Sequence, residues 1–350
     1  MKSKNKTISY LLLSAFIVFF LYSQPIAGQS PNRFRIMFYN VENLFDTEDD
    51  PNTNDDEYVA GGQRGWSEYR LRTKWSNIFK VMAAVGQGSL PDIVGFCEVE
   101  NRYVLEQLLN QTPLKYHGYE IIHRDSRDSR GIDVAMLYRK DKYWPLEEHF
   151  IAVQFTNSDR LSRDILYSKG LLPNNDTLHI FINHWPSKFG GAMATRPLRD
   201  DVARTLKTIT DSIQQSNPQA LIVITGDFNT NPDDEPIVRT LGAALFNDTA
   251  NAKLVNLTTA IYPSKYLGTL KFQGIWDCID QFIITKPFIN SSKGKTKTSE
   301  EHIHIGYYDF LLENDETYLG KKPFRTYIGF KYNGGYSDHL PIYLDLILYD

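Results

Sequence analysis

Carboxylate and amide side chains recur at the ends of apolar stretches in this chain. Asn40 ends one apolar run, Glu98 lies in Gly-Phe-Cys-Glu-Val, and Asp227 follows Leu-Ile-Val-Ile-Thr-Gly. Burying a carboxylate without a partner costs several kcal/mol. A hard divalent cation would supply that partner, because oxygen ligands suit Mg²⁺ and Mn²⁺. The pattern therefore predicts a magnesium or manganese site.

A second set of polar residues adds two histidines. Asp280 interrupts Trp-Asp-Cys-Ile-Asp-Gln, Asp338 and His339 lie in Tyr-Ser-Asp-His-Leu-Pro, His184 follows Leu-His-Ile-Phe-Ile-Asn, and Asn229 lies two residues after Asp227. No pair of histidines or cysteines has the close spacing of zinc ligands, so zinc is the less favoured metal.

Each of these residues also has a structural explanation. Asp227, and Asp338 with His339, could lie in ordinary turns, and Asn40 could cap a turn. Glu98 could be an exposed residue at a strand end, and Asp280 could form a structural ion pair. His184 could simply pack beside Trp185.

Apolar runs that predict strands precede most of these polar residues. We expect strands over residues 34–40, 91–99, 119–123, 132–138, 178–183, 220–225, 276–285 and 343–349. The spacing of apolar residues predicts helices over 70–85, 101–109 and 197–215. Polar stretches over 46–65 and 290–301 predict exposed loops. The mixture indicates a single α/β domain over residues 33–349, in which helices cover the sheet and strand ends carry the site.

The first residues have the three-part plan of a secretory signal peptide, which we assign to residues 1–28. Three lysines precede an apolar run from Ile8 to Leu21, and small residues follow at Ala27 and Gly28. A membrane anchor is the alternative, but the run is shorter than the roughly 20 residues that span a bilayer. We expect a secreted or periplasmic protein with no stable membrane insertion after processing.

Composition is that of a globular protein and limits the class of partner. The 350-residue chain has a formal net charge of -4, and no region forms a basic patch that would indicate nucleic-acid binding by charge alone. A nucleic-acid enzyme remains open, because metal ions can supply positive charge at its site. The two cysteines, Cys97 and Cys278, are too few for a disulfide scaffold or a structural zinc site, and we expect buried free thiols.

Six short stretches, which include most of the residues above, resemble in sequence and in their order along the chain the endonuclease/exonuclease/phosphatase superfamily. They resemble most of all its deoxyribonuclease-like members of the secreted bacterial type. The superfamily also contains abasic-site endonucleases, bacterial sphingomyelinases and inositol-polyphosphate phosphatases. The resemblance extends from about Phe34 to Leu348. Its stretches are Phe-Tyr-Asn-Val-Glu-Asn-Leu-Phe (38–45), Gly-Phe-Cys-Glu-Val (95–99), Ile-Asn-His-Trp-Pro-Ser (182–187), Thr-Gly-Asp-Phe-Asn (225–229), Ile-Asp-Gln-Phe (279–282) and Ser-Asp-His-Leu-Pro (337–341).

The resemblance implies a four-layer α/β sandwich, with two mixed β-sheets packed face to face and helices outside. It also implies roles for the residues named above. Glu98, Asn40 and Asp338 would hold the metal. His339, oriented by Asp280, and Asp227 would activate water or polarise the phosphate. Asn229 would stabilise charge in the transition state, and His184 would protonate the leaving oxygen or bind phosphate. These roles meet the needs of phosphoryl transfer for charge neutralisation, an aligned water and a proton.

Substrate choice is the least constrained prediction. Arg130 and Lys188 are candidates to bind substrate phosphate, although Arg130 and Arg163 could equally form structural ion pairs. We expect a secreted endonuclease acting on nucleic acid, because His184 and the export signal favour a deoxyribonuclease-like role. A phosphatase or phospholipase acting on inositol phosphates, sugar phosphates or sphingomyelin is the alternative, and a non-catalytic binding module is a third. No protein partner is evident.

Overall fold

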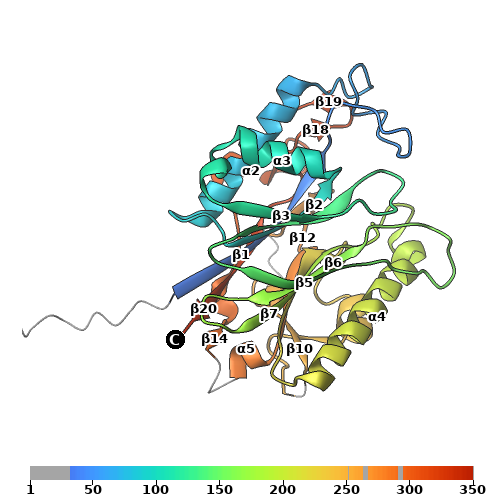
Figure 1. Ribbon diagram of the computed structural model, residues 1–350. Coiled ribbons are helices and arrows are strands. Elements are labelled where there is room, and N and C mark those ends of the chain that lie inside the picture. The colour runs from blue at the N-terminus through green and yellow to red at the C-terminus, as the bar shows by residue number, and fades with distance from the viewer. Residues whose placement is uncertain (1–31, 251, 263–266, 291–294, 350) are drawn as a thin grey trace, which may run out of the picture. The chain divides into compact units, whose positions relative to one another are not determined.

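The computed structural model describes residues 32–250, 252–262, 267–290 and 295–349 (Figure 1). Residues Arg33–Asp350 form one compact unit. Residues 1–28, the expected signal peptide, lie outside the described ranges. Within those ranges, each helix lacks the length or the apolar character that spanning a bilayer requires.

Most of the strands among the described residues form two seven-stranded mixed sheets. The first has the order β14-β20-β1-β2-β4-β3, and β15 also pairs with β20. Its strands are β1 (Asn32–Leu44), β2 (Ile93–Val99), β3 (Tyr119–His123), β4 (Asp133–Arg139), β14 (Thr296–Lys297), β15 (Ile303–Ile305) and β20 (Ile342–Leu348).

The second sheet has the order β5-β6-β7-β8-β13-β10-β9. Its strands are β5 (Trp144–Ile151), β6 (Ile165–Leu171), β7 (Thr177–His184), β8 (Leu221–Asp227), β9 (Ala243–Leu245), β10 (Leu254–Asn256) and β13 (Asp280–Thr285). Each sheet has a parallel pair near its centre, β1 with β2 in the first and β7 with β8 in the second.

The two sheets pack face to face, and helices cover their outer faces (Figure 1). Side chains alternate along β1, so Ile36 and Phe38 lie between the sheets while Met37 and Tyr39 lie under the helices. The sheets approach closely at Gly95, where an added Cβ would lie 2.7 Å from Ile182 Cδ1. The expected four-layer α/β sandwich is confirmed.

Four helices occur among the described residues: α2 (Glu68–Gly86), α3 (Arg102–Gln111), α4 (Ala192–Ser216) and the short α5 (Pro287–Asn290). α2 and α3 cover the first sheet and α4 covers the second. Ser67 caps α2 by accepting the backbone N–H of Arg70, and Asn101 caps α3 by accepting that of Val104. The apolar stripe predicted over 70–85 is thus the buried face of α2.

Three small hairpins lie outside the two sheets: β11–β12 (Leu270–Phe272 and Ile275–Asp277), β16–β17 (Leu312–Asn314 and Lys321–Pro323) and β18–β19 (Tyr327–Ile328 and Lys331–Tyr332). Short helical turns occupy Pro113–Tyr116, Pro236–Leu241, Leu257–Ala260, Glu300–His302 and Asp309–Leu311.

Three predictions about secondary structure were wrong in detail. The single strand expected over 276–285 is broken after Asp277, because Cys278 donates its N–H to Asn231 instead of to a ladder. The loop expected over 290–301 contains β14, whose Thr296 is buried, although residues 291–294 lie outside the described ranges. The helix expected from residue 197 begins at Ala192 and carries Pro197 inside it. Both cysteines are buried and free, as expected.

Candidate active site

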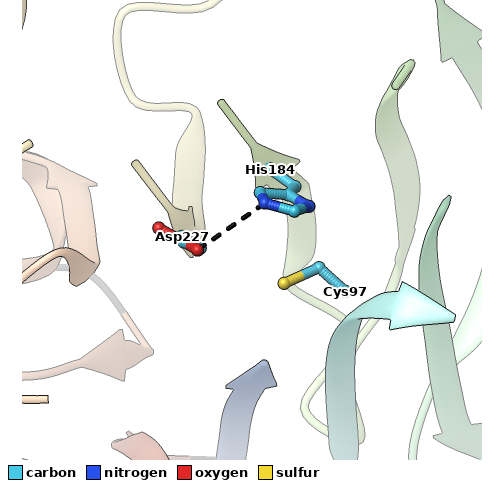
Figure 2. Close-up of side chains that lie close together, drawn as sticks. All are labelled: Cys97, His184 and Asp227. Atoms are coloured by element: carbon cyan, nitrogen blue, oxygen red, sulfur yellow. Dashed lines mark ion pairs between the residues drawn. The ribbon is translucent and has the colours of Figure 1, made fainter. Parts of the chain in front are cut away.

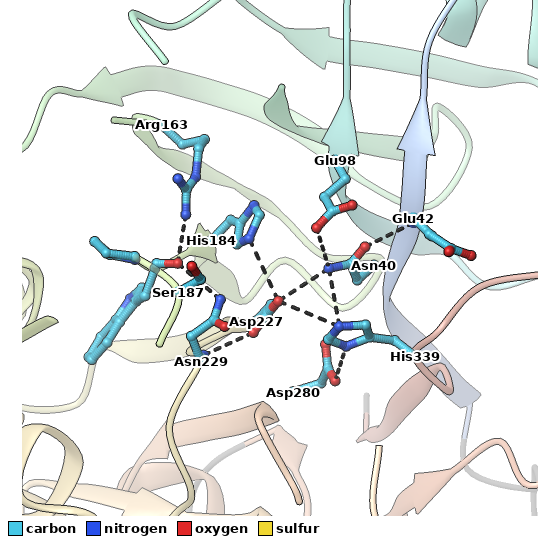
Figure 3. A network of polar contacts seen from close by, with 12 residues as sticks. Asn40, Glu42, Glu98, Arg163, His184, Ser187, Asp227, Asn229, Asp280 and His339 are labelled. Atoms are coloured by element: carbon cyan, nitrogen blue, oxygen red, sulfur yellow. Dashed lines mark hydrogen bonds and ion pairs between the residues drawn. The ribbon is translucent and has the colours of Figure 1, made fainter. Parts of the chain in front are cut away.

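The parallel strand pairs bring the predicted site residues to one edge of both sheets. Asn40 of β1 pairs in register with Cys97 of β2, which puts Glu98 beside Asn40. His184 at the end of β7 pairs with Asp227 at the end of β8, and Asp280 at the start of antiparallel β13 also pairs with Asp227. These polar side chains converge in Figure 3.

The backbone at this edge is strained. Of the eight non-glycine residues with positive φ in the described chain, four lie here: Glu42, Asn43, Glu98 and Asn229, with φ of 50°, 57°, 61° and 49°. Such conformations cost of order 1 kcal/mol or more for residues that carry a Cβ, and they cluster at functional sites. Glu98 lies within β2, at a shift in the register between β2 and β4.

The Asn40 side chain contacts several of the polar side chains that converge at this edge. Its side chain is fully buried, and its Nδ2 lies 3.2 Å from Glu98 Oε1, 3.2 Å from Asp227 Oδ2 and 3.4 Å from His339 Nε2. Its Oδ1 accepts the backbone N–H of Glu42 at 2.9 Å, which sets the orientation of the amide. The two N–H groups of the amide therefore donate to the carboxylates of Glu98 and Asp227, and His339 Nε2 lies beside them.

His339 is held by Asp280. The Nδ1 of His339 lies 2.7 Å from Asp280 Oδ2, and its backbone N–H donates to Ser337 Oγ at 3.1 Å. Burial alone would lower the pKa of His339, but the Asp280 carboxylate, with Asp227 and Asp338, raises it well above the ordinary value. The imidazole is therefore oriented, and its cation is stabilised.

Asp227 lies between the two histidines. Its Oδ2 is 3.7 Å from His184 Nε2 and 3.8 Å from His339 Nε2, and its Oδ1 accepts the backbone N–H of Asn229 at 2.9 Å. Burial raises the pKa of Asp227 to about 7, and nearby Asp280 and Glu98 add to the rise while His339 opposes it. A carboxyl with such a pKa can exchange a proton near neutral pH.

His184 differs from His339 in its charge. Burial lowers its pKa well below the ordinary value, and Arg163, Arg130 and His339 lower it further. The ring is therefore neutral, and its Nδ1 is buried with no hydrogen-bond partner among the described residues.

Asn229 and Arg163 share one acceptor next to His184. Asn229 Nδ2 donates to the Trp185 carbonyl at 3.1 Å, and Arg163 Nη2 donates to the same oxygen at 2.6 Å. The Arg163 guanidinium also pairs with Asp128 at 2.9 Å, and Arg130 pairs with Asp128 at 3.1 Å. The ion-pair alternative for Arg130 and Arg163 is thus present, and Arg130 keeps a half-exposed side chain.

Asp338 lies beside the network through Arg325, a residue that the sequence did not single out. Arg325 Nη2 lies 3.0 Å from Asp338 Oδ2, and its Nε lies 3.1 Å from Oε1 of the buried Glu42. Burial would raise the pKa of Asp338, but Arg325 holds it below the ordinary value. Because Arg325 follows no apolar strand and belongs to no motif, no local signal could have identified it.

Lys188 lies in the loop after β7, 4.0 Å from Asp234. Its neighbour Phe189 is 92% exposed. This loop leads from His184 into α4, so a cation and an aromatic ring lie within five residues of the candidate acid (Figure 3 shows Ser187 of the same loop).

The donor set at this edge fits a divalent cation. One ligand atom each from Asp227, Asp280 and His339 lies within 4.8 Å of the others, and the Asn40 amide links Asp227 to a further carboxylate oxygen, Glu98 Oε1. Asp280 Oδ1 is buried without a hydrogen-bond partner among the described residues. Several carboxylates with so few donors are the arrangement that a hard cation stabilises.

Comparisons with known proteins agree on the fold. A profile described as Endonuclease/Exonuclease/phosphatase family matches residues 35–347. No curated protein sequence matches the chain significantly.

Solved structures give further matches. D. rerio TDP2, complexed with a single-strand DNA product, is 15% identical with a TM-score of 0.54, and the match covers 90% of this chain and 99% of that one. A Bacteroides thetaiotaomicron mannosyl-6-phosphatase is 16% identical with a TM-score of 0.55, covering 90% and 100%. The human Nocturnin catalytic domain, with bound sulfate, is 13% identical with a TM-score of 0.53, covering 90% and 94%. At these identities the likeness is one of fold.

Proposed function

The chain belongs to the endonuclease/exonuclease/phosphatase family of metal-dependent phosphoester hydrolases, and from this premise we propose that it is an endonuclease that hydrolyses nucleic-acid phosphodiester bonds. The observation that carries the proposal is Asp227 between two imidazoles of different charge, with the His339–Asp280 pair on one side and neutral His184 on the other. That arrangement offers a proton acceptor, a cation and a second imidazole around one point.

Glu98 and Asn40, with Asp338 nearby, would hold Mg²⁺ or Mn²⁺. The ion would neutralise charge on the phosphate and lower the pKa of a water. Asp227 would accept the proton of the attacking water, because its pKa of about 7 suits transfer near neutral pH. Its position between the two imidazoles keeps the acceptor close to any phosphate that they bind.

His339, as a cation, would donate from Nε2 to a phosphate oxygen while Asp280 keeps Nδ1 engaged. Asn229 would stabilise the developing charge from a position set by the Trp185 carbonyl. His184, on the other side of Asp227, would bind phosphate or pass to the leaving oxygen the proton that Asp227 takes from the attacking water. Arg163 would hold the Trp185 carbonyl in place for Asn229.

A nucleic-acid substrate is favoured by the loop after His184. Lys188 offers a charge to a phosphate, and the exposed ring of Phe189 offers a surface on which a base can stack. Arg130, half-exposed beyond Asp128, would contact the backbone further along. A strand of several nucleotides would engage both sides of the site, whereas a small phosphoester reaches only its centre.

A phosphatase or phospholipase is the second candidate. The match to the mannosyl-6-phosphatase structure covers 100% of that chain and 90% of this one. The net charge of -4 is also less suited to binding nucleic acid than to binding a small phosphoester. We also propose that residues 1–28 direct the protein out of the cytoplasm, on the basis of their sequence alone.

The deciding experiment is hydrolysis with Mg²⁺ or Mn²⁺, measured in parallel on plasmid DNA, RNA, sphingomyelin, inositol phosphates and mannose 6-phosphate. Asp227→Ala and His339→Ala are the inactive controls. Nicking of DNA that both substitutions abolish would support the endonuclease. Release of phosphate or head group with inert nucleic acid would assign the second candidate, and the absence of any substitution-sensitive activity would favour a binding module.

A further inference from the structure

A second group of metal-ligand types lies at the inner side of the site. Cys97 near the end of β2, His184 and Asp227 each offer one ligand atom, and these three atoms lie within 4.8 Å of one another (Figure 2). All three residues are buried. They come from three strands of two sheets, so no spacing in the sequence indicated the group.

His184 is poorly satisfied by the protein. Its side chain is 3% exposed, its Nδ1 has no hydrogen-bond partner among the described residues, and its Nε2 faces Asp227 Oδ2 at 3.7 Å, too far for a hydrogen bond. A buried imidazole normally uses both ring nitrogens. The ring is therefore an unpartnered polar group directed at a carboxylate and a thiol.

The ligand types match Zn²⁺. A thiolate, an imidazole and a carboxylate are the ligands that Zn²⁺ takes, whereas Mg²⁺ takes oxygen ligands only. In a tetrahedral zinc site the ligand atoms lie roughly 3.3–3.8 Å apart, as the metal–ligand lengths imply. The 3.7 Å between His184 Nε2 and Asp227 Oδ2 is close to that spacing, and the thiol sulfur lies within 4.8 Å of the other two ligand atoms.

The charges also balance. One Zn²⁺ ion with the Cys97 thiolate, the Asp227 carboxylate and a neutral His184 carries no net charge, which limits the cost of burying the ion. Binding requires the Cys97 thiol to give up its proton to solvent as the zinc–sulfur bond forms.

We propose that Cys97, His184 and Asp227 form a zinc site that inhibits the enzyme. Zinc bound there occupies Asp227 and His184, which the proposed reaction needs as proton acceptor and phosphate ligand. The inhibition rests on the proposed function, whereas zinc binding itself does not. Zinc thus acts at a place next to, and chemically different from, the carboxylate oxygens of Glu98.

Binding is tested without any substrate. Metal-free protein is titrated with Co²⁺ as a spectroscopic substitute for Zn²⁺, and a thiolate-to-cobalt charge-transfer band in the near ultraviolet is expected. Zn²⁺ added afterwards should abolish the band. Cys97→Ser should lack the band, and Cys278→Ser, which removes the other buried thiol, should keep it. Cys97→Ala serves as a second variant, and circular dichroism confirms that each variant is folded.

Inhibition is tested with the substrate that the parallel assay identifies, at saturating Mg²⁺. The concentration of Zn²⁺ that halves the rate should rise at least about tenfold in Cys97→Ser and stay unchanged in Cys278→Ser. The absence of a cobalt–thiolate band in the native protein would overturn the site. A band with equal zinc inhibition of Cys97→Ser and native protein would overturn its inhibitory role. If no substrate is cleaved, the proposed function fails while the cobalt titration still decides the site.

Discussion

The two ends of β1 bury charge in opposite ways. At its start, Arg35 is 3% exposed and makes two hydrogen bonds of 2.6 Å to Asp345, while its backbone N–H donates to Asp92 at 2.8 Å. Toward its other end, Asn40 donates its two N–H groups to Glu98 and Asp227 at 3.2 Å, with His339 Nε2 beside them at 3.4 Å. At the first end Arg35 and Asp345 form a short pair of opposite charges, and the second end gathers carboxylates around a neutral amide.

The difference separates stability from function. A buried, bidentate ion pair strongly destabilises the fold when one partner is removed. A cluster of carboxylates with long contacts has unused capacity to bind a cation or a proton. The strained φ of Glu98 and the partnerless Asp280 Oδ1 belong to the second end only. The following changes would break or sharpen this contrast.

Asp227→Asn should have the largest effect. We expect kcat to fall by about 10²–10⁴-fold, because the proposed proton acceptor is lost. In metal-free protein at pH 8 the free energy of unfolding should rise. Burial raises the pKa of Asp227 to about 7. The free energy of unfolding of the native protein therefore falls as the pH rises from the ordinary pKa of a carboxyl group through 7. Steady-state kinetics and urea unfolding measure the two effects.

The matched control for that variant is Asp248→Asn, at an exposed position, which should change neither quantity. An Asp227→Asn enzyme with activity within tenfold of the native value would remove Asp227 from the mechanism.

Asp345→Asn should have the converse effect. The free energy of unfolding should fall by about 3–5 kcal/mol, because Arg35 is left as a buried, unpaired charge. Activity per folded molecule should be unchanged, since the pair lies at the other end of the strand. Arg35→Met combined with Asp345→Leu should lose less stability than the single variant, because no charge remains buried. Equal losses in the two variants would contradict the ion-pair explanation.

Asp280→Asn should reduce kcat by about 10²-fold. The substitution removes the carboxylate that raises the pKa of His339, so this pKa should fall. Activity of the variant should then decline at a lower pH than the activity of the native enzyme. A pH–rate profile from 5.5 to 8.5 tests this, and identical profiles for the two proteins would show that Asp280 does not set the charge of His339.

Protonation of His179, near the start of β7, should have the smallest effect of all, and the effect is on stability. This histidine contrasts with His184 at the end of the same strand. It lines a pocket of about 1030 Å³, and its Nδ1 lies 2.8 Å from Tyr167 Oη. Burial, with Lys169, lowers its pKa to about 4. The unfolded chain therefore takes up the proton first, and stability should fall by roughly 1 kcal/mol between pH 7 and 5.5.

The measurement is urea unfolding at both pH values, in native protein and His179→Gln. The variant should lose about that part of the pH dependence, and an unchanged slope would mean that His179 is not the titrating group. Activity should be the same in both proteins, which separates this histidine from His184.

Much of the fold and of the site was predictable from local patterns. The strand that carries Asn40, the strand before Asp227 and the helix over 70–85 were recognised because burial imposes a period of two on strands and of about 3.6 on helices, although β1 continues past Asn40 to Leu44. The site residues stood out because polar groups at the ends of apolar strands conflict with burial. By contrast β5 and β6 were missed: β5 lies at a sheet edge, where most of its side chains are exposed, and its pattern carries little information.

The sequence by itself determined the fold class, the family resemblance and which polar residues would end buried strands, since these follow from side-chain type and periodicity. Only the tertiary structure decided which charged and polar groups interact with one another. The pairing of Arg325 with Asp338, the Arg163 contact to the Trp185 carbonyl and the approach of Cys97 to His184 each join residues from separate elements. Charge interactions depend on distance and burial, and neither is set by position along the chain until the two sheets have packed together.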